Sequence, residues 1–178
     1  MLHQFGEGGR RPGSARRSIA ALALIASALV ATGAARADGF ARGAEDYAHG
    51  SYPRAARLLA ANAERGDARA QTYLGVLYLR GEGVPQNFEA AGYWLHAAAE
   101  AGVPAAQYFL GLMYDKGQGT RQDFVMAHAW LNIAAAHATP RWRRSWTLIR
   151  DAVASKMSEA QLLEARRLAL EWRPETRP

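Results

Sequence analysis

Residues 70–94 read AQTYLGVLYLRGEGVPQNFEAAGYW, and residues 106–130 repeat the pattern as AQYFLGLMYDKGQGTRQDFVMAHAW. Many positions of the first copy return unchanged 36 residues later, among them Ala70, Gln71, Leu74, Gly75, Tyr78, Gly81, Gly83, Phe88, Ala91 and Trp94. A fixed period of this length is typical of helical repeat proteins, in which one helix pair stacks on the next. The repeat therefore predicts an all-α fold.

Each copy is predicted to form two helices separated by a glycine-rich turn. In the first copy, residues 81–85 (GEGVP) end a helix near 69–80, because glycine adopts positive φ and proline cannot continue a helix. Asn87 is then predicted to cap a second helix of about 88–100, and Asp123 to do the same in the next copy.

A glycine also lies inside the first helix of each copy, at Gly75 and Gly111. Glycine in a helix interior costs about 1 kcal/mol relative to alanine. We expect a compensating close approach to the paired helix, where Ala91 and Ala127 offer small surfaces. The tryptophan that ends each copy is large enough to fill the gap between successive units.

The repeat extends in weaker form to both sides. Residues 40–66 are predicted to form a first, shorter helix pair, followed by units at about 67–102 and 103–138. Residues 141–173 keep helical periodicity but lose the glycine pattern, as expected of helices that cap the open end of a solenoid. Residues 174–178 are predicted to be a flexible tail.

This layout resembles the Sel-one-like repeats, which are relatives of the tetratricopeptide repeat. The second unit carries the resemblance at Ala70, Leu74, Gly75, Tyr78, Gly81, Gly83, Val84, Ala91, Trp94, Ala98, Ala99 and Gly102. The third unit repeats most of it but has Thr120 in place of the valine. The resemblance implies a right-handed α-α superhelix (a solenoid) of about three helix pairs, acting as an adaptor for other proteins.

The first 37 residues are predicted to be an export signal. Arg16 and Arg17 precede an apolar run at 19–31, which suits a signal-peptide core and is shorter than the roughly 20 residues of a membrane span. Residues 35–37 (Ala-Arg-Ala) supply a cleavage site, so the mature chain is predicted to begin at Asp38. We expect export to a bacterial periplasm, or secretion, with no stable membrane insertion after signal removal.

Two alternatives to this export route stay open. The apolar run can instead be retained as an anchoring helix. The arginine pair also permits twin-arginine export, although its surroundings favour general secretion.

The composition argues against several classes of function. The chain has no cysteine, so it forms no disulfide and no thiolate site. Residues 1–37 hold five of the 22 basic residues and one of the 16 acidic ones, so most of the net charge of +6 belongs to the predicted signal. Nucleic-acid binding requires a clustered basic face, and we predict no nucleic-acid partner.

The sequence contains no recognisable catalytic, cofactor-binding or metal-binding motif. We therefore predict a non-enzymatic protein with no cofactor and no metal. The alternative, suggested by exported relatives, is a cell-wall (peptidoglycan) binding or hydrolytic protein of the envelope. An enzyme would show a polar cluster with shifted pKa values in a cleft, whereas a scaffold would show an apolar groove.

Binding residues are expected among positions that differ between the two copies. Positions 73, 76, 77 and 80 have the i, i+3, i+4, i+7 spacing of one helix face. The family resemblance places the first helix of each unit on the concave side. The predicted partner-binding residues on this face are Tyr73, Val76, Arg80, Phe109, Leu112 and Lys116. A peptide or protein partner suits such a stripe; the alternative is that Tyr73 and Phe109 simply pack on the next unit.

Overall fold

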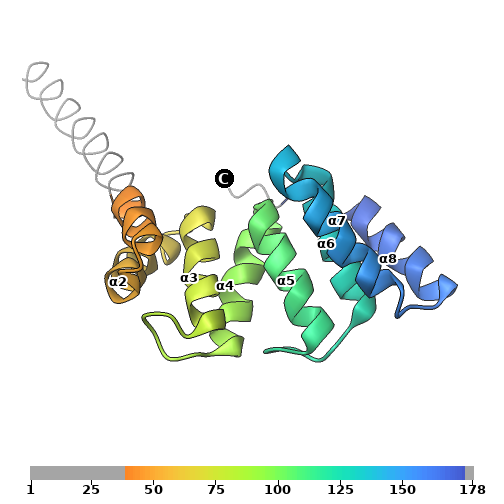
Figure 1. Cartoon of the computed structure of the whole chain (residues 1–178), viewed down its shortest axis with the longest axis horizontal. Coiled ribbons are helices and arrows are strands. Elements are labelled where there is room, and N and C mark those ends of the chain that lie inside the picture. The colour runs from red at the N-terminus through yellow and green to blue at the C-terminus, as the bar shows by residue number, and fades with distance from the viewer. Residues whose placement is uncertain (1–38, 175–178) are drawn as a thin grey trace, which may run out of the picture. The chain divides into compact units, whose positions relative to one another are not determined.

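The computed structural model describes residues 39–174, and the predicted export signal lies outside the described residues. All regular structure in this part of the chain is helical (Figure 1). Residues 39–48 are helical, and the later helices are α2 (Tyr52–Ala63), α3 (Ala68–Arg80), α4 (Phe88–Glu100), α5 (Pro104–Lys116), α6 (Phe124–His137), α7 (Pro140–Ala154) and α8 (Glu159–Glu171). None of the helices between residues 39 and 174 has the length and apolar character needed to cross a membrane.

The helices follow one another as stacked hairpins (Figure 1). Each helix from α2 to α6 packs mainly on the helices before and after it in the chain, and α7 and α8 both pack on α6. Contacts that are confined to neighbouring units define a solenoid. The predicted all-α repeat fold is therefore confirmed.

The turn inside each repeat is built from a glycine and an N-cap residue. Gly81 follows α3 with a φ of 71°, and Gly117 follows α5 with a φ of 67°. The Asn87 side chain accepts a hydrogen bond from a first-turn amide of α4, and the Asp123 side chain does the same for α6. Both predicted N-caps are confirmed.

Gly75 and Gly111 lie where the paired helix comes closest. A Cβ on Gly75 would lie 2.6 Å from Leu95 Cγ and 3.3 Å from the Ala91 carbonyl oxygen. A Cβ on Gly111 would lie 2.7 Å from Leu131 Cγ. The expected close approach is confirmed, and a leucine of the paired helix is the nearest neighbour.

A buried glutamine joins each unit to the one before it. Gln107 Nε2 donates a hydrogen bond to the Ala99 carbonyl at 3.1 Å, and Gln71 Nε2 donates to the Ala63 carbonyl at 3.1 Å. Both carbonyls lie in the last turn of a helix, where intrahelical donors are missing. The bond explains why both copies of the repeat carry a glutamine at this position.

The two repeated tryptophans are buried to different extents. Trp130 is 4% exposed and belongs to the main core cluster, together with Leu95 and Leu110. Trp94 is only half-buried and packs against the preceding cluster, which contains Leu59. Both side chains fill space between units, but Trp130 is surrounded more completely.

The first helix pair uses the same packing in a degenerate form. A Cβ on Gly43 would lie 2.8 Å from Leu59 Cγ, much as one on Gly75 would lie against Leu95. This pair therefore belongs to the solenoid although its sequence keeps little of the repeat.

α7 and α8 cover the C-terminal end of the stack. Val153 of α7 and Ala165 of α8 are buried. Trp172 directly follows α8 and packs edge-on against Trp130, with ring centroids 6.0 Å apart. Leu163, on the opposite side of α8 from Ala165, is 60% exposed, so the cap buries one face and leaves the other to solvent.

Candidate partner-binding groove

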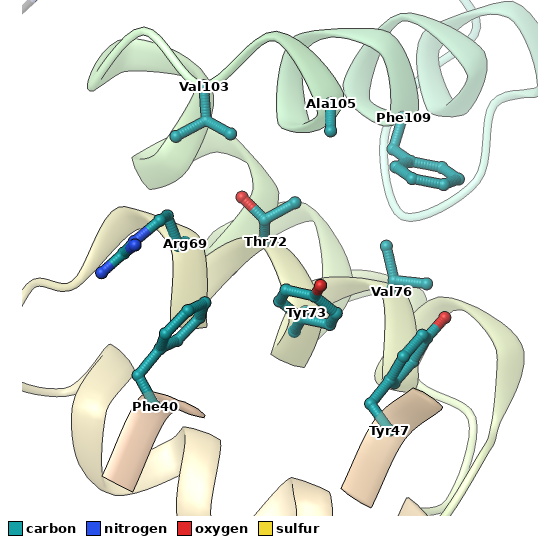
Figure 2. A pocket seen from close by; sticks show the side chains of 9 residues that line it. All are labelled: Phe40, Tyr47, Arg69, Thr72, Tyr73, Val76, Val103, Ala105 and Phe109. Atoms are coloured by element: carbon teal, nitrogen blue, oxygen red, sulfur yellow. The ribbon is translucent and has the colours of Figure 1, made fainter. Parts of the chain in front are cut away.

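An apolar pocket of about 320 Å³ opens along the first helices of the units. Its lining comes from residues 39–48, from α3 and from the beginning of α5 (Figure 2). The lining residues are Phe40, Tyr47, Arg69, Thr72, Tyr73, Val76, Val103, Ala105 and Phe109. We call this site the aromatic pocket.

One face of α3 supplies nearly half of the lining. Arg69, Thr72, Tyr73 and Val76 have the i, i+3, i+4, i+7 spacing that places side chains on one face of a helix. Val76 is 4% exposed. The Thr72 hydroxyl donates to the Ala68 carbonyl at 2.8 Å, so its donor is already used within the helix.

Three aromatic rings hold one another in place at the pocket wall. The Tyr73 ring centroid lies 6.0 Å from that of Phe40 and 5.0 Å from that of Tyr47, both in edge-to-face geometry. Figure 2 shows Tyr73 in the middle of the pocket, with these two rings on one side and Phe109 on the other. The wall is thus formed before any ligand arrives.

Cations lie at the edges of this aromatic wall. The Arg69 guanidinium lies 4.3 Å from the centroid of the Phe40 ring, in a cation–π contact. Arg80 Nη1 donates to the Tyr47 hydroxyl at 3.3 Å. Burial raises the pKa of the Tyr47 hydroxyl, with the Arg80 charge opposing this, so the phenol stays neutral near pH 7.

The aromatic pocket contains half of the predicted partner-binding residues. Tyr73, Val76 and Phe109 line it. The others do not: Arg80 lies beside Tyr47 and Glu82, Leu112 is half-buried, and Lys116 is exposed. The pocket is displaced by about one helical turn toward the start of α3, and a role of all six residues in binding stays a prediction.

Sequence reasoning missed the contribution of residues 39–48. Phe40 and Tyr47 come from the degenerate first unit, where the repeat offers no alignment for a binding stripe. Arg69 and Thr72 were within reach of the sequence, since they precede Tyr73 on the same face of α3. Their position one helical turn before Tyr73, on the same face of α3, is the sequence signal that predicts them as lining residues.

Among residues 39–174, no three side chains of the ligating types (His, Cys, Asp, Glu) gather closely enough to hold an ion.

The fold defines an α-helical repeat protein, with the aromatic pocket along its first helices. The model of the Sel1 repeat family matches residues 68–103 and 104–138. The matched segments coincide with the α3–α4 and α5–α6 pairs. Proteins of this family are generally scaffolds for protein–protein interaction.

The solved structures that are similar to the chain include the following two. One is a protective antigen of uropathogenic Escherichia coli strains that displays an SLR fold, with 28% identity, a TM-score of 0.70 and 77% of this chain covered. The other is a Sel1 repeat protein from Oxalobacter formigenes, with 38% identity, a TM-score of 0.49 and 51% of this chain covered. The chain spans only 29% and 26% of these two proteins. No curated protein is significantly similar to it.

Proposed function

We propose that this chain is an exported, non-enzymatic scaffold that binds a protein or peptide segment in the aromatic pocket. The observation that carries the proposal is the preformed aromatic wall of Phe40, Tyr47 and Tyr73, which faces Phe109 across the pocket. Rigid aromatic side chains bind partners at a low cost in conformational entropy. Aromatic anchors also carry much of the energy of protein interfaces.

The character of the pocket indicates what enters it. Its lining is mostly aromatic and aliphatic, and its volume of about 320 Å³ lies at the small end of ligand sites, which span roughly 300–1,000 Å³. The Thr72 hydroxyl donates to its own helix, and the lining contributed by residues 39–174 contains no histidine or carboxylate to act as a base. These features favour insertion of one or two large apolar side chains over catalysis.

Export is supported by the sequence of residues 1–37. The measurement is cell fractionation followed by N-terminal sequencing of the recovered protein. We expect a periplasmic or secreted species that begins at Asp38. A full-length species held in the membrane fraction would instead support the anchoring alternative.

Binding at the pocket is tested with a photo-reactive residue at its rim. Benzoylphenylalanine replaces Arg69, which is exposed and lines the pocket, and in a matched variant replaces Arg57, an exposed arginine of α2 outside the lining. Irradiated envelope fractions should give a cross-linked partner from position 69 and none from position 57. Mass spectrometry then identifies the partner and the segment bound.

The cross-link must depend on the aromatic wall. Adding Phe109→Ala to the position-69 variant should remove the product while the circular dichroism spectrum stays helical. A product of equal yield from both positions, or one that survives Phe109→Ala, would contradict binding in the aromatic pocket.

A further inference from the structure

A second cavity, of about 370 Å³, lies between α6, α7 and α8 and shares no lining residue with the aromatic pocket. We call it the terminal cleft. Its lining residues are His128, Asn132, Arg150, Asp151, Ala154, Leu162, Arg166 and Leu170. The repeat pattern does not extend to α7 and α8, so packing of the repeat does not account for this polar set.

Hydrogen-bond donors outnumber acceptors in the terminal cleft. Arg150 uses three of its five N–H donors, two on Asp151 Oδ1 at 2.9 and 2.7 Å and one on Asn132 Oδ1 at 3.1 Å. Its other two donors make no hydrogen bond with residues 39–174. Because Asn132 Oδ1 accepts from Arg150, the Asn132 NH₂ group is also left as a donor.

Arg166 adds a second guanidinium to the cleft lining. It makes no hydrogen bond or ion pair with the described residues 39–174, whereas its neighbour Arg167 pairs with Glu164 at 2.6 Å and with Glu171 at 2.7 Å. All five donors of Arg166 are therefore open to a ligand.

His128 supplies an unsatisfied polar group at the wall of the cleft. The residue is 4% exposed, and its Nδ1 is buried without a hydrogen-bond partner in the described part of the chain. Burial lowers the pKa of His128, and the charges of Arg150 and Arg166 lower it further. The imidazole is consequently uncharged near pH 7. Buried polar atoms without partners are uncommon in native proteins and point to an absent ligand or water.

The net charge of the cleft lining is +1, which a bound monoanion would neutralise. Arg150 and Arg166 contribute two positive charges and Asp151 one negative charge, and no other charged residue among residues 39–174 lines it. Guanidinium groups form paired, charge-assisted hydrogen bonds with carboxylates. Ala154, Leu162 and Leu170 add an apolar wall beside these donors.

We propose that the terminal cleft binds an aliphatic monocarboxylate of the kind found at the C-terminus of a peptide. Arg166 and Arg150 hold the carboxylate oxygens, and the Asn132 amide donates to the same group. Leu162 and Leu170 contact the aliphatic side chain next to the carboxylate. This site is independent of the aromatic pocket and of the partner bound there.

The probe is N-acetyl-alanyl-leucine, titrated into the purified protein and followed by NMR of the arginine side-chain N–H groups. Its C-terminal amide is the matched neutral probe, and inorganic phosphate is the competing anion. We expect saturable shifts at Arg150 and Arg166 with the free acid only. Arg166→Gln should weaken binding about tenfold or more, since hydrogen bonds to charged groups are strong.

Arg167→Gln is the control, because it removes an equal charge one residue away on α8 and outside the cleft lining. It should leave the affinity unchanged, which separates a local contact from a general charge effect. Equal binding of the amide, unchanged binding by Arg166→Gln, or no binding of the acid at millimolar concentration would each overturn the proposal. Tighter binding of phosphate than of the acid would overturn the assignment to carboxylates.

Discussion

Gly119 lies against the backbone of Phe88, so that a Cβ at position 119 would overlap the Phe88 carbonyl group. Gly83 lies against the backbone of Tyr52 in the same manner. Phe88 begins α4 and Tyr52 begins α2, so the turn of each unit rests on the second helix of the unit before it. These contacts explain the second glycine of each G-x-G turn and set the distance between units.

Gly119→Ala is expected to destabilise the domain strongly. The φ of Gly119 is 68°, and an L residue held in such a sparsely populated region costs about 1–3 kcal/mol. The steric overlap with Phe88 adds to this cost. Urea unfolding followed by circular dichroism measures the loss.

The control is Gly66→Ala. Gly66 has a φ of 87° but nothing within 4 Å of its Cβ position, so this variant measures the cost of the backbone conformation alone. Equal losses in the two variants would show that the overlap is relieved without cost.

Gly75→Ala and Gly92→Ala should change stability in opposite directions. Gly92 lies inside α4 with only Met113 Cε near its Cβ position, at 3.5 Å, so alanine should stabilise the helix by about 0.5–1 kcal/mol. Gly75 has Leu95 Cγ at 2.6 Å, and overpacking typically costs about 1–3 kcal/mol. The midpoints of thermal unfolding should move up for Gly92→Ala and down for Gly75→Ala. A shift of both midpoints in the same direction would contradict the packing of Gly75 on Leu95.

Trp130→Ala should be more destabilising than Trp94→Ala. Truncation of a buried tryptophan costs about 3–5 kcal/mol, and Trp130 is 4% exposed within the main core. Trp94 occupies the equivalent repeat position but is only half-buried, so its loss removes less area from the core. Chemical denaturation of both variants gives the comparison. The idea fails if Trp94→Ala loses as much free energy of unfolding as Trp130→Ala.

Stability should decrease as the pH falls below the ordinary pKa of histidine, because of His128. Its pKa is lowered from 6.5 in the folded protein by burial and by Arg150 and Arg166, with Asp151 opposing. The unfolded chain therefore binds this proton at a higher pH than the folded chain. The free energy of unfolding consequently falls as the pH drops from about 7 through 6.5 and levels off below the lowered value.

The check on His128 is the pH dependence of urea unfolding for the unsubstituted protein and two variants. His128→Gln should flatten the slope in this pH range. His49→Gln removes an exposed histidine and should leave the slope in place. A slope that survives His128→Gln would assign the proton uptake to another group.

The aromatic pair Tyr73 and Phe109 should carry more of the partner affinity than the cationic pair Arg80 and Lys116. Both pairs belong to the predicted stripe, but only the aromatic residues line the pocket. Tyr73→Ala with Phe109→Ala should abolish the cross-link from position 69, whereas Arg80→Ala with Lys116→Ala should reduce it less. Retained helicity is the control for both double variants. A stronger effect of the cationic pair would move the binding surface toward the C-terminal ends of α3 and α5.

The local features of the repeat were within reach of sequence reasoning. Gly81, Gly117, Asn87 and Asp123 act within a few residues of their own positions, because helix ends and turns depend on nearby backbone groups. The close approach at Gly75 was also foreseeable, since a glycine inside a helix requires a compensating contact.

The two candidate binding sites could be predicted only in part from the sequence. The helical period placed Tyr73 and Val76 on one face but did not determine which turn of that face opens into a pocket. Phe40 and Tyr47 meet Tyr73 because the degenerate first unit stacks on the second, and its sequence shows too little of the repeat to be aligned. The terminal cleft depends on helices outside the repeat, where no period relates one side chain to another.

The sequence alone therefore determined the all-helical repeat, its 36-residue period and the caps and glycines of each turn. These features follow from interactions along one helix or across one turn, which residue type and spacing specify. Only the tertiary structure decided that Phe40 and Tyr47 line the same pocket as Tyr73, and that His128 lines the same cleft as Arg150 and Arg166. Contacts of this kind depend on how separate helices pack. A small rotation of one helix relative to another changes which side chains touch.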